Sequence, residues 1–74
     1  MKKKLVLADG TYEGEVKSGF RNGYGKMTYK NGDVYEGNWL YGMRHEKGKM
    51  TYKNGDVYEG NWSYGNRHGT VPGG

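Results

Sequence analysis

Two histidines are the residues of this chain best suited to bind a metal ion. His45 and His68 occupy equivalent positions of a repeated pattern with a 23-residue step. One step corresponds to two strands of a sheet, or about 9.5 Å at about 4.8 Å per strand. A shared ion needs both nitrogens within about 2 Å, so this spacing excludes it unless the loops bend together. Glu46 beside His45 adds at most a weak surface site, and the chain has no cysteine. We therefore expect no metal and no cofactor, and loop histidines that hydrogen-bond to the backbone.

Groups that could catalyse a reaction are equally sparse. Ser18 and Ser63 have no partner pattern for a catalytic triad. Residues 23–26, Gly-Tyr-Gly-Lys, resemble part of a phosphate-binding loop. No helical pattern follows them, so the helix N-terminus that would bind a phosphate is missing. The sequence therefore predicts a protein that is not an enzyme.

Two sets of positive side chains are candidates for contact with an anionic ligand: Lys2, Lys3, Lys4, Arg21, Arg44 and Arg67. The three arginines recur at the 23-residue step and could bind phosphates or acidic side chains. The alternative that we favour is packing of each guanidinium on the Tyr and Trp rings of the adjacent repeat. The three lysines would each contribute about 1 kcal/mol near an anionic membrane, which gives weak, salt-sensitive attraction.

The same 23-residue step organises the whole chain. It relates Tyr12, Tyr35 and Tyr58, and residues 25–39 recur unchanged at 48–62. We predict one repeat domain over residues 1–74, with full repeats at 12–34 and 35–57 and an incomplete repeat at 58–74. A cap strand is predicted over 3–8 and a frayed tail over 70–74.

Each repeat has the pattern of a β-hairpin. Residues 35–39 alternate large or small residues with polar ones, 41–47 are predicted to form a loop, and 48–52 a second strand. Asn54-Gly55 marks the next turn. A three-residue turn, with Gly55 at positive φ, keeps Met50 on the same face as Tyr58. For the cap, we predict a two-residue Asp9-Gly10 turn that pairs Leu7 with Tyr12.

The predicted fold class is all-β: an elongated, single-layer antiparallel sheet of tandem 23-residue hairpins with its large side chains on one face. An aromatic ladder and an edge strand are the candidate interaction residues: Tyr12, Tyr29, Tyr35, Trp39, Met50, Tyr52, Tyr58 and Trp62. A single layer has no second layer to cover its rings, and strand 57–63 is an open edge. We therefore expect a homodimer or a larger self-assembly.

These motifs resemble the MORN repeat (membrane occupation and recognition nexus). The resemblance rests on Tyr-Glu-Gly-x-Trp, Gly-x-Arg-His, Gly-x-Gly and Asn-Gly-Asp at a step of 23, and it covers residues 5–69. Val16 replaces the typical Trp, Asn22 replaces His, and Glu46 replaces Gly. The resemblance implies a single-layer sheet of hairpins without catalysis. It also implies binding to proteins, to acidic phospholipids or to a second copy.

Three functions follow as hypotheses. The first is a scaffold or protein-interaction module that self-associates. The second is a peripheral module for acidic phospholipids, and the third is a regulatory fragment of a larger lipid kinase or lysine methyltransferase. The net charge of +4 allows acidic partners without requiring them. Nucleic acid is disfavoured as a partner because the sheet itself needs the rings. The apolar stretch at residues 5–8 is too short for a signal peptide, so we predict a cytoplasmic protein, alone or peripheral to a membrane or the cytoskeleton.

Overall fold

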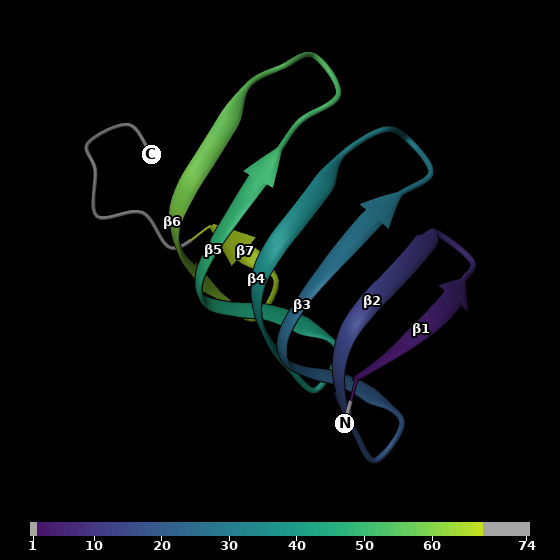
Figure 1. The fold of residues 1–74 in the computed structure, drawn as a ribbon. Helices are drawn as coiled ribbons and strands as arrows, with labels where there is room; N and C mark the ends of the chain where they lie inside the picture. Colours follow the sequence, from purple (N-terminus) through teal and green to yellow (C-terminus); the bar gives the residue numbers. More distant parts are fainter. Residues whose placement is uncertain (1, 68–74) are drawn as a thin grey trace.

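A computed structural model describes residues 2–67 as one open antiparallel sheet of seven strands (Figure 1). Neighbours in the sheet are neighbours in the chain: β1 Lys2–Leu7, β2 Gly10–Lys17, β3 Phe20–Tyr29, β4 Val34–Leu40, β5 Met43–Thr51, β6 Val57–Ser63 and β7 Asn66–Arg67. The predicted all-β, single-layer fold is confirmed. The predicted frayed tail, 70–74, and His68 lie outside the described residues. Within residues 2–67 no helix is long and apolar enough to cross a bilayer.

The turn between β5 and β6 has the predicted length. The Tyr52 N–H donates to the Asp56 carbonyl at 2.7 Å, which closes a three-residue turn over 53–55. Gly55 has φ 97°, a conformation that favours glycine. Met50 therefore lies opposite Tyr58. The hydrophobic pattern fixed this register, because a shift of one residue would turn every side chain to the other face.

The cap hairpin has a different register from the predicted one. Leu5, not Leu7, lies opposite Tyr12, and the two turn residues are Ala8 and Asp9. Gly10 instead belongs to β2, where a Cβ would overlap the backbone of β3, so close strand contact explains this glycine. The shift is two residues, and both leucines still pack against the buried rings.

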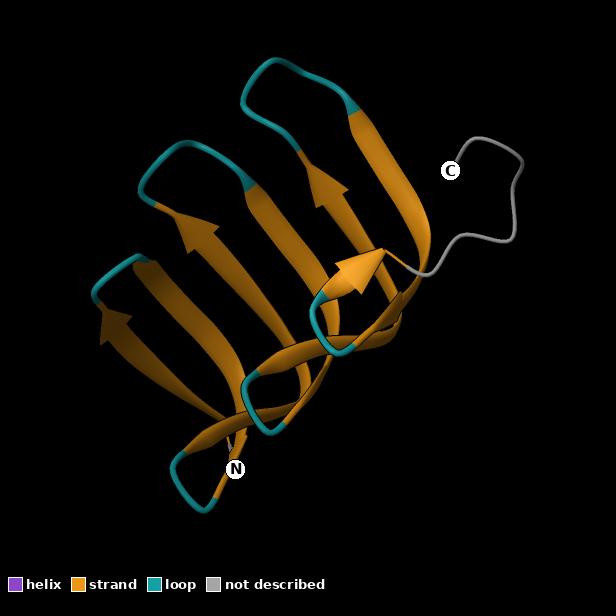
Figure 2. Ribbon diagram, turned by 180° about the vertical axis from the view of Figure 1, so that it is seen from behind, coloured by secondary structure: helices purple, strands orange, loops and turns teal. Residues whose placement is uncertain are grey.

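The predicted loop over 41–47 is mostly strand. Only Tyr41 and Gly42 form the turn, and β5 begins at Met43. Between Gly37 and Trp39 the pairing of β4 with β5 shifts by two residues, and β2 and β3 show the same irregularity after Gly14. Such bulges bend strands. In Figure 2 the strands curve strongly toward the turns that join β2 to β3, β4 to β5 and β6 to β7, which we call the hairpin tips.

The bulge of β5 holds Glu46 at φ 58°, where the equivalent residue of β3 is Gly23 at φ 101°. A side chain in the left-handed region costs about 1 kcal/mol. We expect Glu46→Gly to raise the free energy of unfolding by about 0.5–1 kcal/mol, measured by denaturant titration. Gly23→Ala is the matched control and should lower it, because a Cβ there would meet the Glu15 carboxylate. A Glu46→Gly variant no more stable than the parent would contradict this account of the bulge.

Candidate functional site

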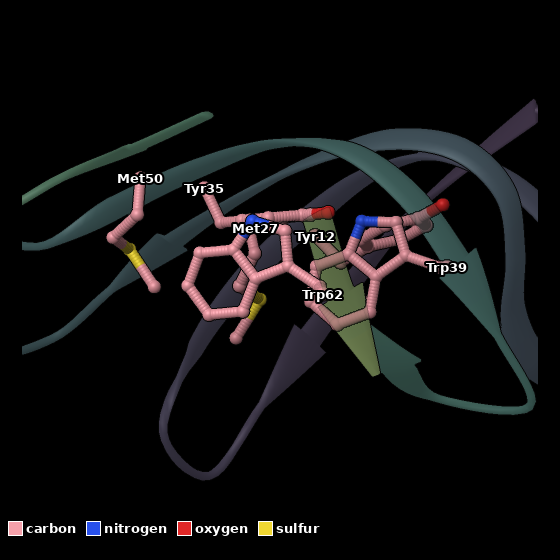
Figure 3. Packing of buried hydrophobic residues seen from close by; sticks show 6 residues of the cluster. All are labelled: Tyr12, Met27, Tyr35, Trp39, Met50 and Trp62. Carbon is pink, nitrogen blue, oxygen red and sulfur yellow. The ribbon is translucent and has the colours of Figure 1, made fainter. Parts of the chain in front are cut away.

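The large side chains of one face form a continuous core (Figure 3). Tyr12, Met27 and Tyr35 have no exposed surface, and Trp39, Met50 and Trp62 are at most 4% exposed. Their rings meet edge to face, as in Tyr35, whose centroid lies 5.1 Å from that of Trp39 and 5.2 Å from that of Trp62. Such contacts add to the free energy of apolar burial.

This burial corrects the expectation that a single layer leaves its rings uncovered. Five of the eight predicted interaction residues are core, namely Tyr12, Tyr35, Trp39, Met50 and Trp62. The other three, Tyr29, Tyr52 and Tyr58, are partly buried against it. The aromatic ladder therefore offers a partner little surface. The exposed candidate surfaces lie at an edge of the sheet and at its hairpin tips.

The arginine row helps to cover this core. The Arg21 guanidinium carbon lies 4.7 Å from the Trp39 ring centroid, Arg44 lies 4.8 Å from that of Trp62, and Arg67 lies 4.8 Å from that of Tyr58. Arg44 also donates to the Gly65 carbonyl at 2.6 Å in the next hairpin. The arrangement is the ring packing that we favoured from sequence. Contact of these arginines with an anionic ligand stays a prediction.

Polar atoms of the buried rings are paired with backbone. The indole N–H of Trp39 donates to the Gly25 carbonyl at 3.1 Å, and that of Trp62 to the Gly48 carbonyl at 3.2 Å. The Tyr35 hydroxyl donates to the Asn38 carbonyl at 3.0 Å. Burial raises the pKa of Tyr35 to about 12, with the nearby Arg44 charge opposing that rise.

The first candidate surface is the outer side of β6. Within residues 2–67, β7 pairs with this strand only at Trp62 and Ser63. Residues 57–60, here called the free edge, have a strand on one side alone. Val57 is 54% exposed, and Tyr58 is only half-buried, although the equivalent Tyr12 and Tyr35 have no exposed surface.

The second candidate surface consists of exposed apolar side chains at the hairpin tips: Phe20, Tyr41, Met43 and Tyr64. We call it the tip strip. Phe20 and Tyr41 touch across two hairpins, with centroids 6.1 Å apart. The tip segments 16–21, 39–45 and 62–67 carry Lys17, Arg21, Arg44 and Arg67 and no acidic residue. Sequence reasoning missed the tip strip, although the 23-residue step aligns Tyr41 with Tyr64.

Tyr41 and Tyr64 begin two-residue turns in the left-handed region, at φ 47° and 49°. Such turns strongly prefer Asn at this position. Two exposed rings are therefore kept where the backbone favours a smaller polar residue. This local cost makes the tip strip a candidate for contact with a partner or a membrane.

The remaining predicted positions lie apart from these surfaces. His45 is in β5 and not in a loop, and its buried Nδ1 has no hydrogen-bond partner, so the expected backbone bond at this atom is wrong. The equivalent Asn22 does accept such a bond, from the Tyr41 N–H at 3.0 Å. In the described part of the chain, no three potential metal ligands among His, Cys, Asp and Glu cluster together.

The lysine run lies on β1, at the other end of the sheet. Lys2, Lys3 and Lys4 are exposed. Together with Lys26 and Glu13 they line a shallow hollow of about 440 Å³ on the polar face. Lys3 lies opposite Gly14, on the face of Leu5 and Tyr12. Three lysines and one carboxylate on the polar face still give this hollow a positive charge. It is suited to an anionic group, and binding there stays a prediction.

Comparison with known proteins identifies the repeat. The family model described as MORN repeat matches residues 12–34, 35–57 and 58–70. These segments are two full repeats and a truncated third, and they cover most of the chain. No curated protein matches the chain.

The raised pKa of Tyr35 makes stability depend on alkaline pH. Between pH 10, where an unfolded tyrosine titrates, and about 12, the unfolded chain releases a proton that the folded chain retains. We expect the contribution of Tyr35 to the free energy of unfolding to be constant below pH 10 and to fall as the pH rises to about 12. Denaturant titrations at stepped pH would measure it.

Tyr35→Phe is the matched variant. It should be less stable at neutral pH, because the bond to Asn38 is lost. Its stability should fall less steeply above pH 10, although Tyr12 and Tyr29, whose pKa values burial also raises, keep part of the slope. An unchanged slope in this variant would contradict the assignment to Tyr35.

Proposed function

Because this chain belongs to the MORN-repeat family, we propose that it is a non-catalytic scaffold that binds other polypeptides and associates with copies of itself. MORN repeats are protein- and membrane-interaction modules, and the family is non-catalytic. The free edge is the observation that supports protein binding. Its equivalents in β2 and β4 have a strand on both sides, whereas residues 57–60 have one among the described strands. An unpaired edge is a template for a strand of another chain.

We propose that self-association uses the edges of the sheet, because the chain covers its own rings. The other open edge among the described strands is β1, where Val6 is 80% exposed. Pairing the free edge with β1 of a second copy would continue the internal register. Glu59 would then face Lys4, and Val57 would face Val6. The result is a head-to-tail association, open at both ends.

Sedimentation equilibrium tests this association. We expect the average mass of the folded chain to rise with concentration above the micromolar range. Glu59→Lys should weaken association about threefold to tenfold, since like charges would face each other. Lys4→Glu should do the same, and a mixture of the two variants should restore association. A folded monomer whose mass does not change with concentration would refute self-association.

Binding to acidic phospholipids is the second candidate, and the tip strip favours it. Exposed aromatic side chains beside arginine side chains suit the interface of an anionic membrane. The hollow lined by Lys2, Lys3 and Lys4 could add contacts to headgroups. A cytoplasmic protein, alone or at the periphery of a membrane or the cytoskeleton, fits both candidates. Regulation of a larger lipid kinase or lysine methyltransferase rests on the family resemblance alone.

Tyr41→Asn combined with Tyr64→Asn separates lipid binding from folding. Asn suits the left-handed turn, so we expect a gain of up to about 1 kcal/mol per site in the free energy of unfolding. Sedimentation with phosphatidylserine vesicles at low salt should show binding several-fold weaker than that of the parent. Tyr24→Thr, which removes an exposed ring from β3, is the control and should bind like the parent. Absence of parent binding even at low salt would refute this candidate.

A further inference from the structure

We propose that the free edge selects one kind of segment: an antiparallel strand reading Gly-Lys-apolar-(Thr or Val), supplied by a different polypeptide. The inference rests on the proposed protein-binding function and adds the chemistry of the partner. Residues 57–60 form four successive positions, and each position favours a different side chain on the incoming strand.

The sheet contains two completed versions of this edge. In the first, Thr11, Tyr12, Glu13 and Gly14 of β2 face Thr28, Met27, Lys26 and Gly25 of β3. In the second, Val34, Tyr35, Glu36 and Gly37 of β4 face Thr51, Met50, Lys49 and Gly48 of β5. β6 presents the same order, Val57-Tyr58-Glu59-Gly60, on the side where residues 2–67 place no strand. The two completed edges therefore give the sequence and register of the missing strand.

Glycine is required opposite Gly60 for a steric reason. The rings of Tyr12 and Tyr35 lie against Gly25 and Gly48, and a Cβ on either glycine would overlap ring atoms. Tyr58 already holds the same conformation, because its hydroxyl donates to the Asn61 carbonyl at 3.0 Å. The slot for an incoming glycine thus exists before any strand binds.

Lysine is required opposite Glu59 for an electrostatic reason. Glu13 lies between Lys4 and Lys26, and Glu36 lies between Lys26 and Lys49. Glu59 has a lysine, Lys49, on one side only. A lysine on the incoming strand would complete the same arrangement of charge. Opposite charges directly across a strand pair are favourable and like charges are not.

An apolar residue is required next, opposite Tyr58. Met27 and Met50 hold this position in the completed edges, where Tyr12 and Tyr35 have no exposed surface. A β-branched residue then covers Val57, as Thr28 and Thr51 cover their partners. Together these two contacts would remove the exposed apolar surface of the free edge from water.

The two segments of this sequence that meet all four requirements, 25–28 and 48–51, are already paired on both sides within the sheet. One repeat after residues 48–51, the sequence reads Val71-Pro72-Gly73-Gly74, which matches none of the four requirements. β1 of a second copy offers Lys4, Leu5 and Val6 in the right order, but Lys3 takes the place of the glycine. Self-association is therefore the weaker use of this edge, and a Gly-Lys strand of another protein is its better match.

A synthetic peptide, Gly-Lys-Met-Thr-Tyr-Lys-Asn-Gly, with both ends blocked, tests the inference against the 74-residue chain. We expect saturable binding by calorimetry, with amide chemical shifts changing most at residues 57–60 in nuclear magnetic resonance spectra. Replacing the first glycine by alanine should weaken binding at least about tenfold, since the Cβ would overlap the Tyr58 ring. Replacing the lysine by glutamate should weaken it about threefold to tenfold, and Glu59→Lys in the chain should restore it.

Peptide binding that is indifferent to Gly→Ala, or that shifts amides elsewhere, would overturn the inference. Lys3→Gly provides a second readout in the chain itself and should tighten self-association several-fold by removing the misfit. A decrease or no change in this variant would count against the glycine requirement. The experiments distinguish failure of the strand motif from failure of the protein-binding function. Loss of peptide selectivity with self-association intact removes only the strand motif, whereas absence of all binding removes the protein-binding function as well.

Discussion

The contact between a tyrosine ring and a glycine of the neighbouring strand is the constraint on which this structure depends. Tyr12 lies against Gly25, and Tyr35 lies against Gly48, so closely that no side chain fits in place of either glycine. The ring then lies along the sheet, where Tyr12 meets Trp39 of the next repeat, and Tyr35 meets Trp39 of its own repeat and Trp62 of the next. Because the second repeat reproduces this contact 23 residues after the first, the same local packing extends from one repeat to the next.

The register of the strands turns this contact into continuous rows. Apolar residues, alternating Lys and Glu, and Thr or Val each run across the sheet from β1 to β6, and a row of glycines runs from β2 to β6. The bulges bend the strands, and the arginines of the tips lie on the tryptophans, so that a single layer buries its core without a second sheet. A chain of this size without disulfides can fold because each repeat shares its buried surface with the next.

Much of the fold follows from the sequence, and the exceptions have physical causes. The side-chain pattern predicted the face and register of Met50 and Tyr58, because burial penalises a one-residue slip. It could not fix the cap register, since a shift of two residues keeps Leu5 and Leu7 on the same face. The alternation of large and polar side chains predicts a loop over 41–47, because the extra residues of the bulge at Glu46 interrupt that alternation. The burial of the rings was missed because it depends on bending, which a period of two does not record. The tip strip was missed because Tyr41 and Tyr64 lie within turns, and Phe20 and Met43 are the first residues of the strands that follow turns.

The two described edges of the sheet, at β1 and at residues 57–60 of β6, are chemically unequal, and the proposed strand binding depends on this inequality. At β1, Lys3 stands where the completed edges have glycine, so the strand can close the array but is a poor mate for a tyrosine ring. At β6, Tyr58 keeps the ring position of its equivalents and leaves the glycine slot vacant among the described residues. Lysine on an edge strand is a common device against indiscriminate pairing. One described edge thus carries a lysine in place of the glycine, and the other carries a tyrosine ring beside an open position among the described residues, which is the difference on which the proposed strand binding rests.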